Sequence, residues 1–415
     1  MKNTAKRQYS KLAVVGLACR YPDADTPDDL LSNSIAQRRS FRIIPEKRLS
    51  AAYFDETGHH PDKAYVQQAA VLRNFKFDRG RFKVPLPSYE NTDMTHWLAL
   101  TVAAEAIHDI RFRENHFKFD NDSVRVVVGN TLAGEFSRAN ILRLRWPYVK
   151  GVVAKQLQES CPELLDSELH ELLQKLEHRY KQPFPVPNED FLSGGLGNTI
   201  AGRICNHFDF RGGGYTIDGA CSSSLLAVTD ACSALTNHDA DVVLAGGVDL
   251  SIDPFELIGF SRTMALARNE MRVFDEFSQG FWPGEGCGFV VLMRYEDAIR
   301  YCSRIYGVIN GWGVSSDGRG GLTRPEVDGQ KLALKRCYER AGYGIETVTY
   351  FEGHGTGTKV GDEVELKALI SSREETKKPI HEAVISSIKA NIGHTKAAAG
   401  LASLIRALKC SEKRL

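Results

Sequence analysis

Short runs of β-branched residues, each closed by glycine, constrain the fold of this chain more than any other feature. Residues 12–16 (Leu-Ala-Val-Val-Gly) and 124–129 (Val-Arg-Val-Val-Val-Gly) are two of these runs. Such short, mostly apolar stretches are typical of strands buried in an α/β sheet. From Gly194 onward strands and helices alternate, and the order strand, helix, strand begins again at Ile305. The pattern predicts two successive α/β halves, which we assign to residues 1–300 and 301–415.

A leucine-rich stretch interrupts the first half after Asn130, where three prolines end a helical pattern. Its repeating residues are Leu164, Leu165, Leu169, Leu172, Leu173 and Leu176, and its prolines are Pro183, Pro185 and Pro187. We expect this insertion to form helices that cap the sheet. The polar stretch between Pro45 and Pro87 has no clear period, so we predict a surface excursion.

The charge and cysteine content exclude several classes of protein. Lys and Arg total 53 and Asp and Glu total 52, a net charge of +1, so nothing favours binding to nucleic acid or an anionic membrane. The apolar runs are far shorter than the roughly 18 residues of a membrane-spanning helix. Nine cysteines are scattered without a Cys-x-x-Cys pair, which argues against a disulfide framework and a zinc site. We therefore expect a soluble protein of the reducing cytoplasm.

Cys221 lies in the segment Asp-Gly-Ala-Cys-Ser-Ser-Ser, at a sharp junction between a predicted strand at 215–218 and a predicted helix at 222–234. This position resembles a nucleophile elbow with sulfur in place of oxygen. Backbone N–H groups at a helix N-terminus favour a thiolate, so we expect a lowered pKa for Cys221. The alternative is a buried structural cysteine. That interpretation applies better to Cys205, Cys232, Cys287, Cys302 and Cys337.

Two histidines follow successive predicted strands of the second half. His354 stands in Glu-Gly-His-Gly-Thr-Gly-Thr, and His394 ends Lys-Ala-Asn-Ile-Gly-His. Active sites of α/β proteins are assembled at strand ends from residues far apart in sequence. Zinc binding is disfavoured, because the cysteine and the two histidines come singly from distant segments. Single loop histidines are usually surface residues, as we predict for His59, His60, His238 and His381.

Three segments resemble the signature motifs of elongating β-ketoacyl synthases, in their order as well as in their residues. They are residues 216–224 around Cys221, 354–358 (His-Gly-Thr-Gly-Thr) and 389–394 (Lys-Ala-Asn-Ile-Gly-His). Residues 198–205 (Asn-Thr-Ile-Ala-Gly-Arg-Ile-Cys) resemble the family too, and the resemblance extends from Leu12 to the last residue. Further segments resemble the ketosynthases of iterative enediyne-type polyketide synthases. These are residues 95–100, 145–148 and 280–287, together with Gly219.

The resemblance implies a thiolase-like fold, with two duplicated α/β halves in a layered αβαβα arrangement. It implies a homodimer paired through the strand before Cys221, and a place among the other domains of a synthase. The main partner would be an acyl carrier protein, whose phosphopantetheine carries the substrates, with no cofactor bound directly by this chain. Cys221 would accept the acyl group, and malonyl carrier would then lose CO₂ to give the carbanion that attacks it. His354 and His394 would stabilise the enolate by hydrogen bonds, and Thr356 and Thr358 would hold the pantetheine arm.

Lys389 precedes the second histidine by five residues. In the family a lysine in this motif is assigned to orienting the site or assisting decarboxylation. The residues leave a second interpretation open, which is a structural ion pair with a residue such as Glu365.

Three related activities are less well matched. A degradative thiolase would need a second cysteine as acid and base, and no suitable motif is present near the C-terminus. A priming ketosynthase pairs cysteine with one histidine and an asparagine, a role for which Asn391 is a candidate, but the setting of His354 favours the two-histidine class. A catalytically silent partner typically loses the cysteine, and Cys221 is present.

Family members continue beyond the second histidine through two more strands and a Gly-Phe-Gly-Gly segment, whereas this sequence ends at Leu415. We therefore expect a fragment or truncated form of a larger synthase, whose second half lacks its last strands. In the family the glycine-rich segment supplies one of two N–H groups that hold the acyl oxyanion. The chain alone is accordingly expected to be a poor or inactive condensing enzyme.

Overall fold

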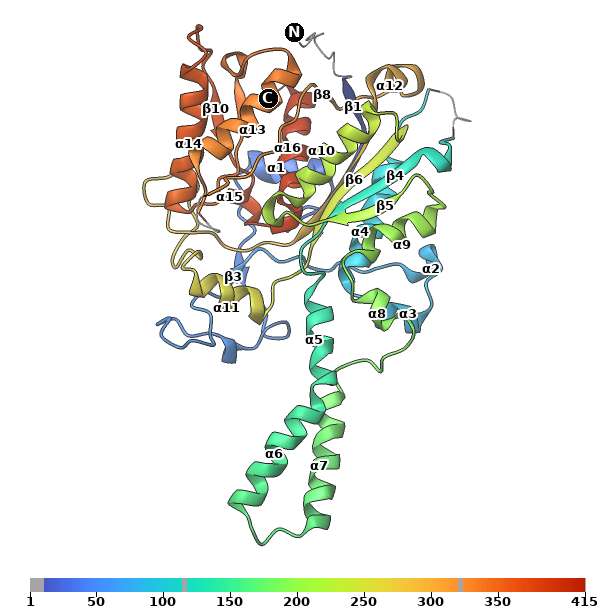
Figure 1. Cartoon of the computed structure of the whole chain (residues 1–415), viewed down its shortest axis with the longest axis vertical. Helices are drawn as coiled ribbons and strands as arrows, with labels where there is room; N and C mark the ends of the chain where they lie inside the picture. Colours follow the sequence, from blue (N-terminus) through green and yellow to red (C-terminus); the bar gives the residue numbers. More distant parts are fainter. Residues whose placement is uncertain (1–10, 114–117, 320–323, 415) are drawn as a thin grey trace.

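The centre of the protein is a six-stranded mixed sheet (Figure 1), seen in a computed structural model that describes residues 11–113, 118–319 and 324–414. The strand order is β5-β4-β6-β7-β1-β8. The strands are β1 (Leu12–Arg20), β4 (Val124–Gly129), β5 (Gly214–Ile217), β6 (Val242–Asp249), β7 (Gly286–Arg294) and β8 (Gly307–Ile309). β5, β4 and β6 are parallel, and β7 runs antiparallel to β6 and β1. The predicted α/β class is confirmed.

Helices cover both faces of this sheet because successive side chains of a strand point in opposite directions. Ala13 and Val15 of β1 pack with α4 (Met94–His108) and α9 (Thr199–Phe208). Leu12 and Val14 enter a second core with α1, α10 and α16 on the other face. These three helices span Pro27–Ile35, Ser223–Thr236 and Ala399–Lys413.

The second half contributes a small parallel sheet of β9 (Tyr350–Glu352) and β10 (Val384–Ser386). Its helices α13 (Val327–Ala341) and α14 (Lys359–Glu374) pack on each other, and α16 contacts both the small sheet and the large one. Figure 1 shows these segments side by side, which agrees with the layered thiolase-like prediction. One strand differs from the prediction, since β8 joins the large sheet, where Ile309 lies opposite Leu12. β8 thereby provides hydrogen-bond partners for the edge of β1.

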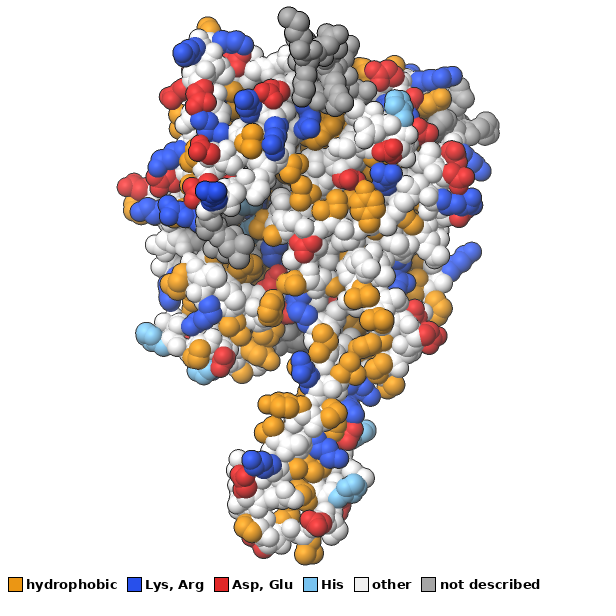
Figure 2. All heavy atoms as spheres, in the orientation of Figure 1, with side chains coloured by type: hydrophobic (Ala, Val, Ile, Leu, Met, Phe, Trp, Pro, Cys, Tyr) orange, Lys and Arg blue, Asp and Glu red, His pale blue; other side chains and the backbone are white. Residues whose placement is uncertain are grey.

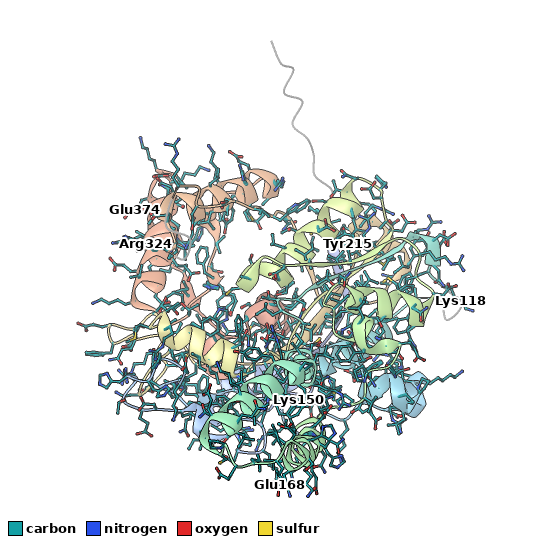
Figure 3. All side chains as sticks on the ribbon, turned by 60° about the horizontal axis from the view of Figure 1, so that its bottom comes forward. Lys118, Lys150, Glu168, Tyr215, Arg324 and Glu374 are labelled. Atoms are coloured by element: carbon teal, nitrogen blue, oxygen red, sulfur yellow. The ribbon has the colours of Figure 1, made fainter. Side chains whose placement is uncertain are left out.

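The leucine-rich insertion forms an arm of three helices. They are α5 (Glu135–Leu144), α6 (Trp146–Ser160) and α7 (Asp166–Lys181). Figures 1 and 2 show the arm projecting away from the body, and Figure 3 turns it forward, with Lys150 on α6 and Glu168 on α7 labelled. The prediction of a cap over the sheet is therefore wrong. Leu169 and Leu173 are buried, but α7 packs against α6 rather than the sheet.

The polar stretch after Pro45 is only partly a surface excursion. β2 (Arg42–Ile43) pairs with β3 (Gln68–Ala69), and Val66 and Val71 are buried in a third core. That core also contains Leu257 of α11 (Pro254–Arg262). The apolar residues of this stretch thus pack against α11, about 190 positions further along the chain. Local periodicity does not reveal such a distant packing partner.

The remaining α-helices of the described residues are short, namely α2 (Arg79–Phe82), α3 (Leu86–Glu90), α8 (Asp190–Gly194), α12 (Tyr295–Tyr301) and α15 (Lys389–Ile392). Within residues 11–113, 118–319 and 324–414, the helices are all too short or too polar to cross a bilayer.

Candidate active site

The three predicted catalytic side chains come from three loops that follow strands. Cys221 follows β5, in the single turn η3 (Ala220–Ser222) that leads into α10. His354 follows β9, and His394 follows β10 and α15. The Nε2 atom of His394 lies 3.0 Å from Sγ of Cys221, and the centroids of the two imidazole rings are 5.5 Å apart. The fold thus brings the three residues into one cluster.

The backbone before Cys221 has the sharp turn expected of a nucleophile elbow. Ala220 has a φ of 51°, a left-handed conformation that is unfavourable for alanine. The turn is held by hydrogen bonds in which Asp218 Oδ1 accepts from the N–H of Ala220 and Ser223 Oγ accepts from the N–H of Gly219, both at 2.9 Å. A strained residue next to the predicted nucleophile supports the functional interpretation of Cys221.

The expected lowering of the Cys221 pKa is wrong. Burial raises the pKa of this thiol, and the carboxylate of Asp249 acts in the same direction. The positive charges of Lys389 and Lys396 offset only part of the rise. Loss of water around the sulfur is the largest of these contributions. The resting thiol is protonated at neutral pH.

His394 is fixed by contacts on both of its ring nitrogens. The N–H of Lys396 donates to Nδ1 at 3.2 Å, so in the neutral ring the proton is on Nε2, the atom that faces Cys221. Burial and the charge of Lys389 lower the pKa of His394 well below its usual range. The ring is therefore a neutral hydrogen-bond donor toward the sulfur.

His354 lies on a loop that is pinned by its own backbone. Glu365 accepts the N–H groups of His354 and Gly355 at 2.6 and 2.9 Å. The surrounding protein and the charge of Lys389 lower the pKa of His354 to about 3, although its side chain remains accessible to solvent. Solvent access weakens that shift, but a pKa at or below the ordinary value of about 6.5 leaves the imidazole neutral at pH 7 in either case.

Lys389 is buried, and its ammonium donates to the backbone oxygen of His354 at 2.7 Å. Burial lowers its pKa, which Glu365 partly opposes by its negative charge. Glu365 itself binds backbone N–H groups of the same loop. The geometry thus favours orientation of the His354 loop over the alternative of a simple ion pair.

Thr356 and Thr358 lie on the same loop, with their hydroxyl oxygens 2.9 Å apart. The buried carboxylate of Asp362 accepts the N–H of Gly357 at 3.0 Å and that of Phe274 at 2.7 Å. The loop that carries the two threonine hydroxyls is therefore held in place by the Asp362 carboxylate. Their predicted contact with a pantetheine arm stays a prediction.

Other predicted residues lie away from the cluster or play structural parts. The amide of Asn391 donates to the backbone oxygen of Arg38 at 2.8 Å, which removes it as the asparagine of a priming ketosynthase. Cys232, Cys287 and Cys302 are buried, and Cys205 and Cys337 are half-buried. The histidines predicted at the surface are exposed, namely His59, His60, His238 and His381.

Three charged residues next to the site were not singled out from the sequence: Asp249, Glu256 and Lys396. They are buried and form ion pairs with one another. One available signal was Asp249 itself, because a carboxylate that closes an apolar strand needs a buried partner.

Gly393 sets the position of His394, and replacing it should disturb both stability and the site. Its φ is +70°, and an added Cβ would lie 2.7 Å from the backbone oxygen of Trp282. We expect Gly393→Ala to reduce the free energy of unfolding by about 1–3 kcal/mol. The matched control is Gly202→Ala in α9, where a Cβ meets nothing within 4 Å, so a gain of about 0.5–1 kcal/mol is expected. Urea unfolding measures both, and equal stabilities would contradict the assigned backbone geometry.

Two family models cover nearly the whole chain. The model described as "Beta-ketoacyl synthase, N-terminal domain" matches residues 10–298, and "Beta-ketoacyl synthase, C-terminal domain" matches residues 306–415. The chain belongs to the β-ketoacyl synthase family. This is a family of acyltransferase-type condensing enzymes, and the predicted ketosynthase resemblance is confirmed at that level.

Among curated relatives of this β-ketoacyl synthase, one component of the polyunsaturated fatty acid synthase of Thraustochytrium sp. is 33% identical over 406 residues. The alignment covers 96% of this chain and 14% of the relative. "Polyketide synthase PksL" of Bacillus subtilis is 29% identical, with 97% of this chain and 8% of the relative covered. The chain thus spans a small part of the curated relatives that it matches.

Solved ketosynthases share the fold. The "PfaC Keto synthase-Chain length factor" structure has a TM-score of 0.82 at 26% identity and covers 97% of this chain and 42% of its own. The oxazolomycin ketosynthase domain OzmH KS7 of Streptomyces albus has a TM-score of 0.77 at 25% identity, covering 97% and 63%. The two solved structures and the two curated relatives described above do not identify the enediyne-type subfamily specifically.

Proposed function

We propose that this chain catalyses decarboxylative Claisen condensation of a malonyl unit with an acyl chain held on Cys221. The observation that carries the proposal is the 3.0 Å contact between Cys221 Sγ and a His394 ring whose proton is held on Nε2. Such a ring donates a hydrogen bond wherever negative charge develops beside the sulfur.

In the first half-reaction Cys221 Sγ attacks the thioester carbonyl of an acyl-carrier substrate. The C–S bond to pantetheine breaks, and the leaving thiolate takes up the proton that Cys221 loses. Because burial raises the pKa of Cys221, a hydrogen bond from the Nε2–H of His394 assists acyl transfer by stabilising the sulfur as its proton leaves, without being essential for that step.

In the second half-reaction malonyl carrier occupies the space between the two histidines. Its carboxylate leaves as CO₂, and the bonding electron pair passes to the thioester oxygen as an enolate. Neutral His354 and His394 donate hydrogen bonds to that oxygen, and Lys389 holds the His354 loop in place. The enolate carbon then attacks the acyl thioester, a carbon–carbon bond forms, and Cys221 is released as thiolate.

The proposed partners follow from this chemistry. An acyl carrier protein delivers both substrates on phosphopantetheine, and Thr356 and Thr358 contact the pantetheine arm. A homodimer is supported by β5, which is an edge strand with exposed residues such as Tyr215 (Figure 3). The two proposed halves, 1–300 and 301–415, are supported by family models that meet between residues 298 and 306. We place the reaction in the reducing cytoplasm, alongside the other domains of a synthase.

Two kinds of synthase are candidates for the whole protein. The sequence favours an iterative enediyne-type polyketide synthase, which makes a polyene. The 33% identity to a component of a polyunsaturated fatty acid synthase favours the second candidate, a synthase of that type.

Product analysis tests the proposal. Mixing the chain with acyl carrier and malonyl carrier should give a carrier-bound 3-oxoacyl product one ketide unit longer, detected by mass spectrometry. In the complete synthase, a conjugated product that absorbs in the near ultraviolet or visible range would support the enediyne type, and isolated double bonds the other. Failure of both preparations to condense, with correctly folded dimers, would instead support a catalytically silent structural partner.

A further inference from the structure

A buried cluster of charges lies next to His394 and takes no part in the two proposed half-reactions. The ammonium of Lys396 is 2.9 Å from Asp249 Oδ1 and 2.9 Å from Glu256 Oε2. The hydroxyl oxygen of Ser251 lies within hydrogen-bond distance of both carboxylates, to one of which it donates. Lys396, Asp249 and Glu256 are 5%, 0% and 8% exposed. Removing these charges from water costs free energy, and the ion pairs and hydrogen bonds within the cluster offset that cost.

The cluster ties three segments together at the level of the site. Asp249 is the last residue of β6, Glu256 lies in the first turn of α11, and Lys396 begins the single turn η5 (Lys396–Ala398) before α16. Asp249 Oδ2 also accepts the N–H of Ala397 at 3.3 Å. The backbone immediately after His394 is therefore anchored to the large sheet through one lysine side chain and one carboxylate.

The backbone of Lys396 is unusual and touches His394. Its φ is 48°, a left-handed conformation that lysine rarely adopts. In this conformation its N–H donates to Nδ1 of His394. This unfavourable conformation needs support from its surroundings. The two ion pairs of the Lys396 side chain provide that support, and the same conformation places the N–H on His394.

The charge of Lys396 acts on the same ring. Asp249 and Glu256 raise the pKa of Lys396, so it stays protonated, and its positive charge helps to lower the pKa of His394. Burial raises the pKa of Glu256 to about 7, and that of Asp249 rises as well. Both the geometry and the charge therefore favour a neutral imidazole that keeps its proton on Nε2.

We propose that Lys396 is a positioning residue, whose ion pairs with Asp249 and Glu256 hold its N–H on Nδ1 of His394 and so fix the Nε2–H tautomer beside Cys221. This inference rests on the proposed function for its meaning in catalysis, but the tautomer itself can be observed without turnover. Lys396 acts through His394 and touches no reacting atom.

The test is ¹⁵N NMR of the whole chain labelled at histidine, with His394 assigned from the spectrum of His394→Asn. Protonated and unprotonated ring nitrogens have well-separated ¹⁵N shifts, so the tautomer is read directly. In the parent protein Nε2 should be protonated. In Lys396→Met a substantial fraction of the Nδ1–H form should be present, and CO₂ release from malonyl carrier should fall by about tenfold or more.

The matched control is Lys409→Met. Lys409 is also 5% exposed and ion-paired to two carboxylates, Asp28 and Glu412, but it lies near the end of α16. This variant should leave the His394 signals unchanged. A shift of the same size in Lys409→Met would show that loss of any buried lysine has this effect and would overturn the proposal.

Lys396→Met leaves two buried carboxylates without a cation and is at risk of misfolding. Combining it with Asp249→Asn and Glu256→Gln removes all three charges while keeping the side-chain shapes, and the same tautomer shift is expected. An unchanged Nε2–H signal in either folded variant would refute the positioning role. If the parent failed to condense acyl chains but showed the tautomer response, the proposed function would fail and this inference would stand.

Discussion

Cys221→Ala is expected to abolish acyl transfer, with the condensation rate falling by a factor on the order of 10³ or more. The reason is that Sγ is the atom that His394 Nε2 faces at 3.0 Å, and alanine offers no nucleophile. The measurement is single-turnover transfer of a radiolabelled acyl group from carrier protein to the chain.

Cys221→Gln separates the two half-reactions. Its side-chain amide can occupy the place of the acyl thioester, so transfer should be lost while CO₂ release from malonyl carrier persists. Cys232→Ala is the matched control, because Cys232 lies on α10 and is fully buried in the core, and both half-reactions should survive. Retention of acyl transfer in Cys221→Ala would show that another group is the nucleophile.

The second large effect concerns the histidines. His354→Ala and His394→Ala should each slow CO₂ release from malonyl carrier by about 10²–10³-fold, because each removes one hydrogen-bond donor from the enolate oxygen. Self-acylation of Cys221 should change by less than about tenfold, since malonyl binding is not involved in that step. Quenched-flow measurements of the two half-reactions give both rates.

His238→Ala serves as the control for the histidine variants, because His238 is exposed in the turn after α10. Neither half-reaction should change in it. If His394→Ala instead lost acylation as severely as decarboxylation, His394 would be the essential base for the thiol. That result would contradict the Nε2–H tautomer inferred from the contact with Lys396.

The strands were the most predictable part of the fold. Residues 124–129 were predicted as a strand and form β4 with the same bounds, and the strand before Cys221 is shifted by only one residue. Continuous β-branched runs closed by glycine leave little choice of conformation. The arm was predicted as helical but placed wrongly, because the spacing of its leucines reveals a buried face without revealing that α6 covers it.

The site was predictable where chemistry is concentrated in short motifs, and less so where it depends on the surroundings. Cys221, His354 and His394 stand in local patterns that mark strand ends. The direction of the Cys221 pKa and the partners of Lys396 depend instead on burial by segments far along the chain. A charged residue next to a motif looks like a surface residue until the fold shows what encloses it.

The central claim is that Cys221 carries the growing chain. It is tested most directly by incubating the unmodified chain with an acyl-carrier substrate, digesting it, and locating the acyl adduct by peptide mass spectrometry. The predicted result is an adduct on the peptide that contains Cys221, formed ahead of any on the other eight cysteines and removed when malonyl carrier is added. Acylation of another residue, with Cys221 unmodified and the carrier deacylated, would contradict the account.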